Sequence, residues 1–382
     1  MNTLSALDAL MQFPDEHRAL LQTLRNARVG LITNHTGQTI DGVSTRDALR
    51  VLDVDVKVLF SPEHGFAGKQ EGDIASTHDD DGLTIHSLYG ATRRPTAEML
   101  GEIDIVIFDI QDVGARFYTY GSTLVYVLEE CAKFNKTLVV FDRPNPLGRK
   151  VEGPMLEKEC QSFIGHVAVP VVHGLTLGEL ALLHKHNEKL DIDLRVMRCR
   201  NWNGELWPQV NLNWIAPSPN LPDFASAQWY PSLCLLEFSD VAVGRGTDAP
   251  FQTVGAPWVN AHRVLDVLQN CKTWRDLGVS AQAIEFTPTR AIYENQLCRG
   301  LKFSARNIAN VSMTDLGLTL LWALRHAGFV EFGEKQLRAS WQLVGSHRVL
   351  DLVENNDLDG ALKLSHEGAK QFVETRKMHL IY

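Results

Sequence analysis

Polar and charged side chains follow several apolar runs of this sequence, and the run that ends near position 110 is the clearest. Ile103 and residues 105–108 favour β structure. The polar residues directly after them are Asp109, Gln111, Asp112 and Arg116. The apolar run predicts a strand buried on both faces, as in a parallel sheet covered by helices. Because open α/β sheets bind ligands beyond the carboxyl ends of their strands, we expect these polar residues to take part in chemistry.

Other predicted strands end in the same way. The predicted strands are residues 27–34, 54–61, 103–110, 137–141 and 167–172. The polar residues at the other four ends are Asn34, His35, Glu63, His64, Asp142, Arg143, Asn145 and His173. Polar residues at a single strand end would be typical of a solvated turn. Because the carboxyl ends of parallel strands share one edge, five polar ends together favour a functional cleft.

Glu63 is the strongest candidate for a general acid. Pro62 restricts Ser61 to extended geometry, and Gly65 lets the backbone turn tightly after the glutamate. We expect a Glu on such a rigid turn, with His64 beside it, to have its pKa raised by desolvation, as a general acid requires. The alternative is a surface Glu in an ordinary turn.

The acids near position 110 offer a partner for Glu63. Asp109 or Asp112 would supply the second carboxylate that glycoside hydrolysis commonly uses. The same two acids, with His64 and His173, would also fit a metal site. Because the sequence has no compact ligand motif such as His-x-x-x-His with a Glu, we expect neither a metal nor another cofactor.

Aromatic residues and one loop complete the candidates. Tyr118 and Tyr120 would stack on sugar faces beside a polar cleft, or would simply pack at the start of the next helix. The loop 243–251 carries Arg245 between glycines. It would close over the cleft and offer Arg245 to an anionic group, since guanidinium suits carboxylates. The alternative is an internal pair between Arg245 and Asp248.

Alternating strands and helices position these residues. Helices are expected at 4–26, in the apolar stripe that begins at Leu124, and from the capping box Thr176–Glu179 to about 189. The alternation predicts an α/β fold, a Rossmann-like, mostly parallel, doubly wound sheet. Because neither Gly-x-Gly-x-x-Gly nor a P-loop motif is present, nucleotide cofactors are disfavoured.

A proline-rich stretch, residues 214–231, marks the expected boundary between two domains. The first, 1–225, would carry the strand-end loops, and the second, 226–382, would be a smaller mixed α+β domain that closes the cleft. In the second domain we expect strands at 234–243 and 297–305, and helices at 314–326 and 358–377. A length of 382 residues suits two domains.

Composition restricts the partners and the compartment. The formal net charge of −9 disfavours nucleic acid and anionic membranes. The six cysteines are scattered, which indicates free thiols in a reducing compartment. The first 25 residues do not resemble a signal peptide, and no run approaches the length of a membrane span. We expect a cytoplasmic enzyme with a small-molecule substrate, and the oligomeric state is open.

A series of motifs in one order resembles the NamZ-like exo-β-N-acetylmuramidases, a family long known only as a domain of unknown function. The motifs are GLITNHTG (30–37), SPEHGFAG (61–68), SLYG (87–90), FDIQDVGARFYTY (108–120), DRPNP (142–146), VEGP (151–154), SPN (218–220), GRGT (244–247) and the final IY (381–382). The resemblance spans nearly the whole chain. It differs at residues 238–240, and many relatives are exported.

The resemblance implies a cleft between a Rossmann-like part and a smaller part. It also implies release of N-acetylmuramic acid from the non-reducing ends of peptidoglycan fragments, with Glu63 as the catalytic glutamate. The expected catalytic residues are Glu63, His64, Asp109 and Asp112. The expected substrate-binding residues are Asn34, Gln111, Arg116, Tyr118, Tyr120, Arg143, His173, Asn220 and Arg245.

The hypothesis is that Glu63 protonates the glycosidic oxygen while His64 tunes or orients it. Asp109 or Asp112 would act as base or nucleophile, or the acetamido group of the substrate would attack instead. Arg116, Arg143 or Arg245 would bind the lactyl carboxylate, with Arg116 the first choice. The rival hypotheses are a metal-dependent hydrolase that uses Asp109, Asp112, His64 and His173, and a non-catalytic amino-sugar-binding protein.

Overall fold

The largest sheet of the protein is mostly parallel and lies within its first two hundred residues. The computed structural model describes residues 2–70, 72, 74–79 and 81–382. In spatial order the strands are β3 (Thr77–His78), β4 (Thr84–Ser87), β2 (Val56–Ser61), β1 (Val29–Thr33), β5 (Ile105–Asp109), β6 (Thr137–Phe141) and β9 (Leu194–Met197). Neighbouring strands are parallel except for β3 and β4. The expected α/β class with a parallel sheet is confirmed.

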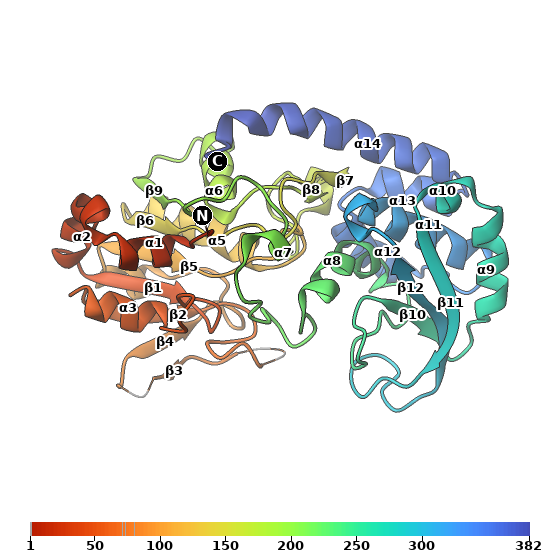
Figure 1. Ribbon diagram of the computed structural model, residues 1–382, viewed down its shortest axis with the longest axis horizontal. Coiled ribbons are helices and arrows are strands. Elements are labelled where there is room, and N and C mark those ends of the chain that lie inside the picture. Colours follow the sequence, from red (N-terminus) through yellow and green to blue (C-terminus); the bar gives the residue numbers. More distant parts are fainter. Residues whose placement is uncertain (1, 71, 73, 80) are drawn as a thin grey trace.

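Helices cover both faces of this sheet (Figure 1). On one face lie α1 (Ala6–Gln12), α2 (Arg18–Arg25) and α3 (Thr45–Val51), and on the other lie α4 (Ala97–Gly101), α5 (Tyr120–Lys133) and α6 (Leu177–Asn187). Leu31 and Ile107 belong to the core on the first face, and Ile32 and Phe108 to the core on the second. Successive strand side chains point to opposite faces, so β1 and β5 are apolar throughout because both faces are covered.

One predicted strand, 167–172, belongs to a different sheet. Its ordered part is β8 (Pro170–Val172), which pairs antiparallel with β7 (Glu152–Met155) in a two-stranded sheet. The prediction that it is the fifth parallel strand is wrong, because β9 takes that place beside β6. Pro170 has no N–H to donate to a ladder, which suits the first residue of a short strand rather than the middle of a large sheet.

The second part of the chain is built around a three-stranded antiparallel sheet in the order β10 (Thr253–Ala256), β12 (Cys298–Ala305), β11 (Val279–Phe286). The short helix α7 (Trp207–Val210) precedes this part of the chain. The helices of the second part are α8 (Phe224–Leu233), α9 (Ala261–Asn270), α10 (Lys272–Asp276), α11 (Met313–His326), α12 (Glu334–Val344), α13 (His347–Glu354) and α14 (Leu358–Thr375). The expected strand at 297–305 and helices at 314–326 and 358–377 are confirmed as β12, α11 and α14.

Two other predictions about elements are wrong. Residues 234–243 form no strand. They begin with the 3-10 helix η3 (Cys234–Leu236), whose side chains are buried, and short apolar runs that are buried on all sides look alike in helices and strands. Residues 4–26 are not one helix, because the 3-10 helix η1 (Pro14–His17) separates α1 from α2. Pro14 has no N–H for a continuing helix.

The carboxyl-terminal segment returns to the large sheet. Figure 1 shows α14 crossing the top of the molecule from the second part towards α6. Beyond it, Arg376 donates to the carbonyl oxygens of His173 at 2.9 Å and of Gly174 at 2.9 Å. The hydroxyl of Tyr382 donates to Oδ2 of Asp142 at 2.8 Å, at the end of β6. The last residues are therefore part of the edge that carries the strand-end loops.

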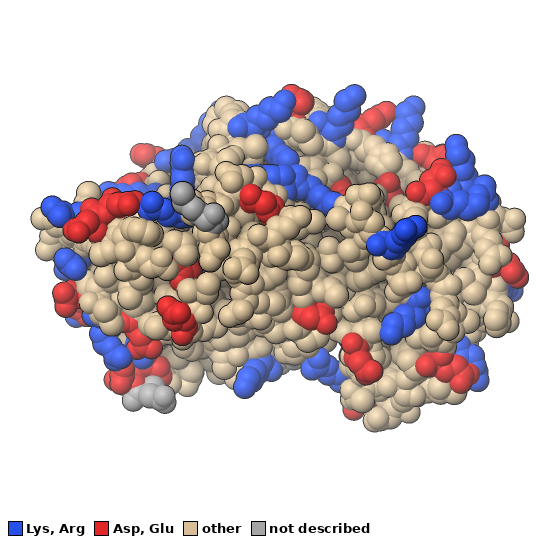
Figure 2. All heavy atoms as spheres, in the orientation of Figure 1, with Lys and Arg blue, Asp and Glu red and all other residues tan. Residues whose placement is uncertain are grey.

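The surface shows charges of both signs. On the face in Figure 2, basic and acidic side chains are interspersed around the rim, and the middle of the face is largely uncharged. Among the described residues, no helix is both long and apolar enough to cross a membrane.

Candidate active site

Glu63 lies on a strained turn directly after β2. His64 and Gly65 follow it with φ values of +70° and +73°, in the left-handed region that a residue with a side chain rarely adopts. The turn is closed by the amide of Gly65, which donates to the carbonyl oxygen of Pro62 at 3.1 Å. Nδ1 of His64 lies 2.9 Å from the carbonyl oxygen of Gln70. The positive φ of His64 therefore restricts the backbone directly after Glu63.

The start of α5 fixes the carboxylate of Glu63. Thr119 is the N-cap residue of α5, but its hydroxyl does not cap the helix. Instead it donates to Oε2 of Glu63 at 2.5 Å. The hydroxyl of Tyr120 lies 3.4 Å from the carbonyl oxygen of Glu63 and accepts from Nδ2 of Asn34 at 2.9 Å. Loops after β1, β2 and β5 therefore meet at this glutamate.

A cavity of about 130 Å³ opens beside Glu63, and both parts of the chain line it. We call it the Glu63 cavity. From the first part it is lined by Glu63, His64, Phe117, Tyr118, Thr119 and Ile164, and from the rest of the chain by Ser218, Asn220, Leu221, Tyr230, Cys234, Glu237, Phe238, Arg245, Phe251 and Leu343. Of the residues singled out in the sequence, it brings together Glu63, His64, Tyr118, Asn220 and Arg245.

Arg245 and Glu237 form an ion pair in the wall of this cavity. The guanidinium carbon of Arg245 lies 5.3 Å from the ring centre of Phe251. Burial acts to lower the pKa of Arg245, but the carboxylate of Glu237 more than offsets it and holds that pKa above its ordinary value. The expected alternative of a pair with Asp248 is replaced by one with Glu237. Sequence reasoning placed Glu237 in a predicted strand, 234–243, and did not connect it with Arg245.

Asp109 and Arg143 do not line the Glu63 cavity. Asp109 is fully buried, and Arg143 donates to both of its carboxylate oxygens, at 2.5 Å and 3.0 Å. The hydroxyl of Thr45 adds a third hydrogen bond at 2.6 Å. Asp109 therefore has no oxygen free for a substrate.

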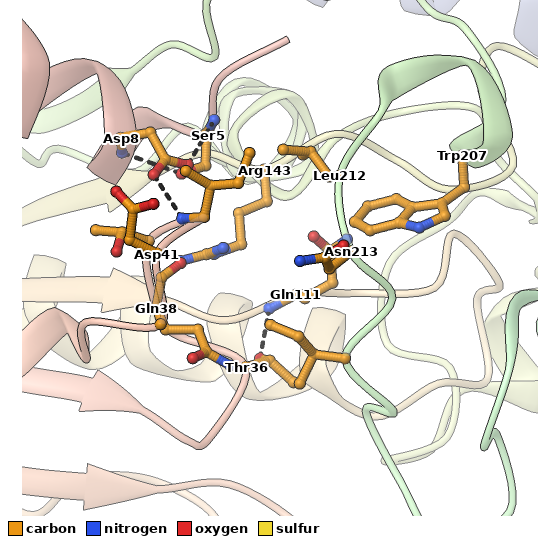
Figure 3. Close-up of a pocket in the computed structure, with 14 residues that line it drawn as sticks. Ser5, Asp8, Thr36, Gln38, Asp41, Gln111, Arg143, Trp207, Leu212 and Asn213 are labelled. Carbon is orange, nitrogen blue, oxygen red and sulfur yellow. Dashed lines mark hydrogen bonds between the residues drawn. The ribbon is translucent and has the colours of Figure 1, made fainter. Parts of the chain in front are cut away.

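A second cavity, of about 270 Å³, lies at the ends of β1, β5 and β6 (Figure 3). We call it the strand-end cavity. It is lined by Ser5, Asp8, Thr36, Gln38, Thr39, Ile40, Asp41, Gly42, Gln111, Arg143, Trp207, Leu212, Asn213 and Ile215. Residues 212–221 contribute to both cavities, with 212, 213 and 215 in this one and 218, 220 and 221 in the other. Gln111 and Arg143 belong here.

Asp112 and Arg116 are buried near a third, very small cavity of about 10 Å³. Oδ2 of Asp112 accepts from the amide of Gly114 at 2.7 Å, whereas Oδ1 has no partner among the described residues. Burial raises the pKa of Asp112 to about 7. Tyr118 lines this cavity as well as the Glu63 cavity, and so it stands between Asp112 and the space beside Glu63.

Arg116 joins the two parts of the chain. Nη1 donates to the carbonyl oxygens of Pro154 and Val169, both at 2.8 Å. Nη2 donates to those of Leu343 at 3.0 Å and Val344 at 2.8 Å, at the end of α12. Burial lowers the pKa of Arg116 to about 9. Arg116 was the first choice for binding the lactyl carboxylate, but its Nη groups are already hydrogen-bonded to backbone carbonyl oxygens.

The remaining strand-end residues hold the loops together. Oδ1 of Asn34 accepts from the amide of Thr36 at 2.9 Å, and Oδ1 of Asn145 from that of Leu147 at 2.9 Å. His173 is buried, and its Nδ1 accepts from the amide of Leu175 at 3.1 Å. Burial lowers the pKa of His173 to about 3, so its ring is neutral. Asp142 accepts from Thr176 at 2.6 Å.

Possible metal ligands gather elsewhere. In the described part of the chain, the two groups of close ligand atoms are Glu129 with His166 and His184, and Glu157 with Cys160 and His347. Neither contains His64, Asp109, Asp112 or His173. In the first group, Glu129 also pairs with Arg94 at 2.6 Å, so a guanidinium already neutralises its charge. The four ligands of the metal-hydrolase hypothesis are not brought together.

Comparisons with known proteins cover the whole fold. The family models described as exo-β-N-acetylmuramidase NamZ match with their N-terminal domain at residues 29–225 and their C-terminal domain at 228–382. The peptidoglycan β-N-acetylmuramidase NamZ of Bacillus subtilis (strain 168) is 35% identical over 366 residues, which cover 94% of this chain and 88% of that protein.

Two crystal structures of DUF1343 family proteins from Bacteroides fragilis NCTC 9343 share the architecture. One has a TM-score of 0.89 at 29% identity, and the other a TM-score of 0.81 at 30% identity. Each comparison covers 100% of this chain and 99% of the other.

Proposed function

Because this chain belongs to the NamZ family of exo-β-N-acetylmuramidases, we propose that it releases N-acetylmuramic acid from the non-reducing end of peptidoglycan fragments with Glu63 as the general acid. It is a glycosidase that hydrolyses β-N-acetylmuramide bonds. The observation that carries the residue assignment is the Glu63 cavity. In it, a carboxyl group on a strained turn shares one space with an arginine from the other part of the chain.

Glu63 transfers its proton to the glycosidic oxygen as the bond to the muramic acid ring breaks. The hydroxyl of Thr119 occupies Oε2 of Glu63, which leaves Oε1 to carry the proton into the cavity. Proton transfer by a positioned acid typically contributes roughly 10²–10⁴-fold in rate. His64, fixed against the carbonyl oxygen of Gln70, lines the same space and orients the leaving group.

Arg245 binds the lactyl carboxylate that distinguishes muramic acid from glucosamine. Its side chain is 31% exposed, and Nε makes the bond to Glu237. Within the described residues, no partner is recorded for either Nη of Arg245. A planar guanidinium with free Nη groups suits a carboxylate. Arg116 does not offer this, because both of its Nη groups donate to backbone carbonyl oxygens, and Arg143 does not line the Glu63 cavity.

The opposite face of the sugar is attacked in one of two ways. Asp109 and Asp112 do not line the Glu63 cavity, so the group must come from elsewhere. Either the acetamido group of the substrate attacks, as in known exceptions to the two-carboxylate rule, or Glu237 activates a water. The first route retains the anomeric configuration and the second inverts it. NMR of the sugar released in the first seconds of hydrolysis separates the two routes.

The assignment of Glu63 is tested with the variant Glu63→Gln, which keeps the shape and the hydrogen bond from Thr119. We expect turnover of a chromogenic β-N-acetylmuramide to fall roughly 10²–10⁴-fold with an unchanged melting temperature. The exposed Glu98→Gln on α4 is the matched control and should retain full activity. Largely unchanged turnover of the Glu63→Gln variant would remove Glu63 from the mechanism. A chelator should have no effect on the natural enzyme.

We also propose that the chain divides into residues 1–225 and 226–382, and that it acts in recycling of the cell wall in the cytoplasm. The six cysteines are free and buried, which suits a reducing compartment. Fractionation of the source cells, with hydrolysis of the muramide measured in each fraction, tests the location.

A further inference from the structure

The strand-end cavity lies where this fold class places its ligands. From β1 the chain moves to β2 and β4 on one side, and then returns to β5 on the other side of β1. The order of the strands therefore reverses between β1 and β5. Open α/β sheets bind ligands beyond the carboxyl ends of the strands at such a point. Thr36 and Gln38, after β1, and Gln111, after β5, line the cavity here.

The backbone at this point is packed so closely that it cannot shift to fill the cavity. A Cβ atom at Gly37 would lie 2.0 Å from Oγ1 of Thr33 and 2.8 Å from the carbonyl oxygen of Asp109. The hydroxyl of Thr36 accepts from the amide of Gln111 at 3.0 Å and donates to Asn34 at 2.6 Å. The floor of the cavity is therefore rigid and preformed, as small-molecule sites commonly are.

The walls combine one indole with several neutral polar groups. In Figure 3, the indole of Trp207 lies beside the amide of Asn213, with Gln111 close to both. Gln38 and Thr39 add an amide and a hydroxyl, and among the described residues the hydroxyl of Thr39 only accepts a bond, from the amide of Val43 at 3.1 Å. Indole presents an apolar body with a polar edge, and amides and hydroxyls both donate and accept hydrogen bonds. This mixture matches a ring that is apolar on its faces and bears hydroxyl groups around its rim.

The charges around the cavity favour a neutral occupant. Arg143 is already neutralised by Asp109. Asp8 and Asp41 add carboxylates, and those of Asp8 are engaged by the hydroxyl of Ser5 and the amide of Ile40. The residues that line the cavity thus carry a net negative charge, which repels an anion.

We propose that the strand-end cavity binds a neutral N-acetylhexosamine ring, at a site distinct from the Glu63 cavity. A volume of about 270 Å³ suits one sugar ring rather than a chain. Because the lining residues carry a net negative charge, we also expect weaker binding of N-acetylmuramic acid, which is N-acetylglucosamine with an added lactyl group and its carboxylate. The two cavities thus have opposite preferences, because the Glu63 cavity holds the arginine with free Nη groups.

The test uses ¹⁹F NMR of the full chain labelled with 5-fluorotryptophan. The chain has eight tryptophans, and the spectrum of Trp207→Phe assigns the signal of Trp207. N-acetylglucosamine should shift this signal in a saturable way, and N-acetylmuramic acid should require a concentration several-fold higher. No shift up to the solubility limit, or equal shifts with the two sugars, would overturn the proposal.

Variants locate the site. Asn213→Ala removes one neutral hydrogen-bonding group from an exposed position and should weaken the Trp207 response about 3–10-fold. Asn187→Ala, at the far end of α6, is the matched control and should leave it unchanged. An unchanged response in Asn213→Ala would place the sugar elsewhere. Asn213→Ala should hydrolyse the muramide at the natural rate, and Glu63→Gln should keep the Trp207 shift. Hydrolysis therefore tests the role of Glu63, and the Trp207 signal tests the strand-end cavity, so that failure of one proposal can be told from failure of the other.

Discussion

Each of the two cavities is lined by an arginine that pairs with a carboxylate, and the two pairs differ in their exposure. Arg143 lines the strand-end cavity and pairs with Asp109, which is not one of the lining residues, and the side chains of Asp109 and Arg143 are 1% and 8% exposed. In the Glu63 cavity, those of Glu237 and Arg245 are 18% and 31% exposed. Both oxygens of Asp109 are occupied, whereas Arg245 uses only Nε for its pair. The same residue types therefore form a fixed support beside one cavity and, as we propose, a ligand-binding group in the other.

The buried pair should give the largest effect on stability. Arg143→Met would leave the carboxylate of Asp109 buried without its cation, and removing one partner of a buried pair typically costs about 3–5 kcal/mol. We expect this loss in the free energy of unfolding, measured by urea denaturation at pH 7. The double variant Asp109→Leu with Arg143→Met should recover much of it. A loss below about 1 kcal/mol in the single variant would show that the pair is not a fixed support.

Asp112 extends the comparison to a buried carboxyl group without a cation. Its pKa is raised to about 7 by burial, whereas an unfolded Asp titrates near 3.9. Between these values the unfolded chain is ionised while the folded chain still holds the proton. Stability from this group is therefore present at about pH 4, declines as the pH rises, and is lost above about pH 7.

Asp112→Asn should remove this slope. At about 1.4 kcal/mol per pKa unit, the natural protein should lose up to about 4 kcal/mol relative to the variant between pH 4 and 7. Urea denaturation across this range measures the difference. Asp266→Asn, at an exposed position of α9, is the control, and its free energy of unfolding should depend on pH as that of the natural protein does. Parallel curves for Asp112→Asn as well would contradict a raised pKa.

The partly buried pair of Glu237 and Arg245 should give the smallest change, and that change should appear in selectivity rather than in stability. Arg245→Gln removes a charged hydrogen-bonding partner worth about 1.5–3 kcal/mol, which corresponds to roughly 10–150-fold in kcat/KM for the muramide. The value for the matching glucosaminide, which lacks the lactyl group, should change little. Arg245→Lys should keep part of the preference. An equal fall for both substrates would assign Arg245 a structural role.

The sequence predicted the four central strands of the main sheet, β2, β1, β5 and β6, because they are apolar runs with polar ends, and it missed β3, β4 and β9. Val29–Thr33, Ile105–Asp109 and Thr137–Phe141 are strands within a residue or two of their predicted limits, since burial on both faces leaves a continuous pattern. The predictions made from this pattern for residues 167–172 and 234–243 are wrong. There, short apolar runs are buried without belonging to the large sheet, and sequence periodicity carries no information on which partner covers them.

The candidate site was predicted only in part for a related reason. Glu63, Tyr118 and Arg245 were recognised from their local motifs, and all three line one cavity. Local motifs gave no sign that Arg116 would be committed to carbonyl oxygens from α12, more than two hundred positions away. Glu237 was missed because its role depends on Arg245, which only the folded chain brings to it.

The return of the carboxyl-terminal segment has a consequence for the order of assembly. The amide of Cys199, just after β9, donates to the hydroxyl of Tyr382 at 2.8 Å, and that hydroxyl in turn reaches Asp142 after β6. During synthesis on the ribosome, residues 376–382 emerge after every strand of the large sheet. The rim of that sheet thus stays open until residues 376–382 have emerged, and nascent chains arrested before Arg376 should be cut readily by protease at the loop after β6.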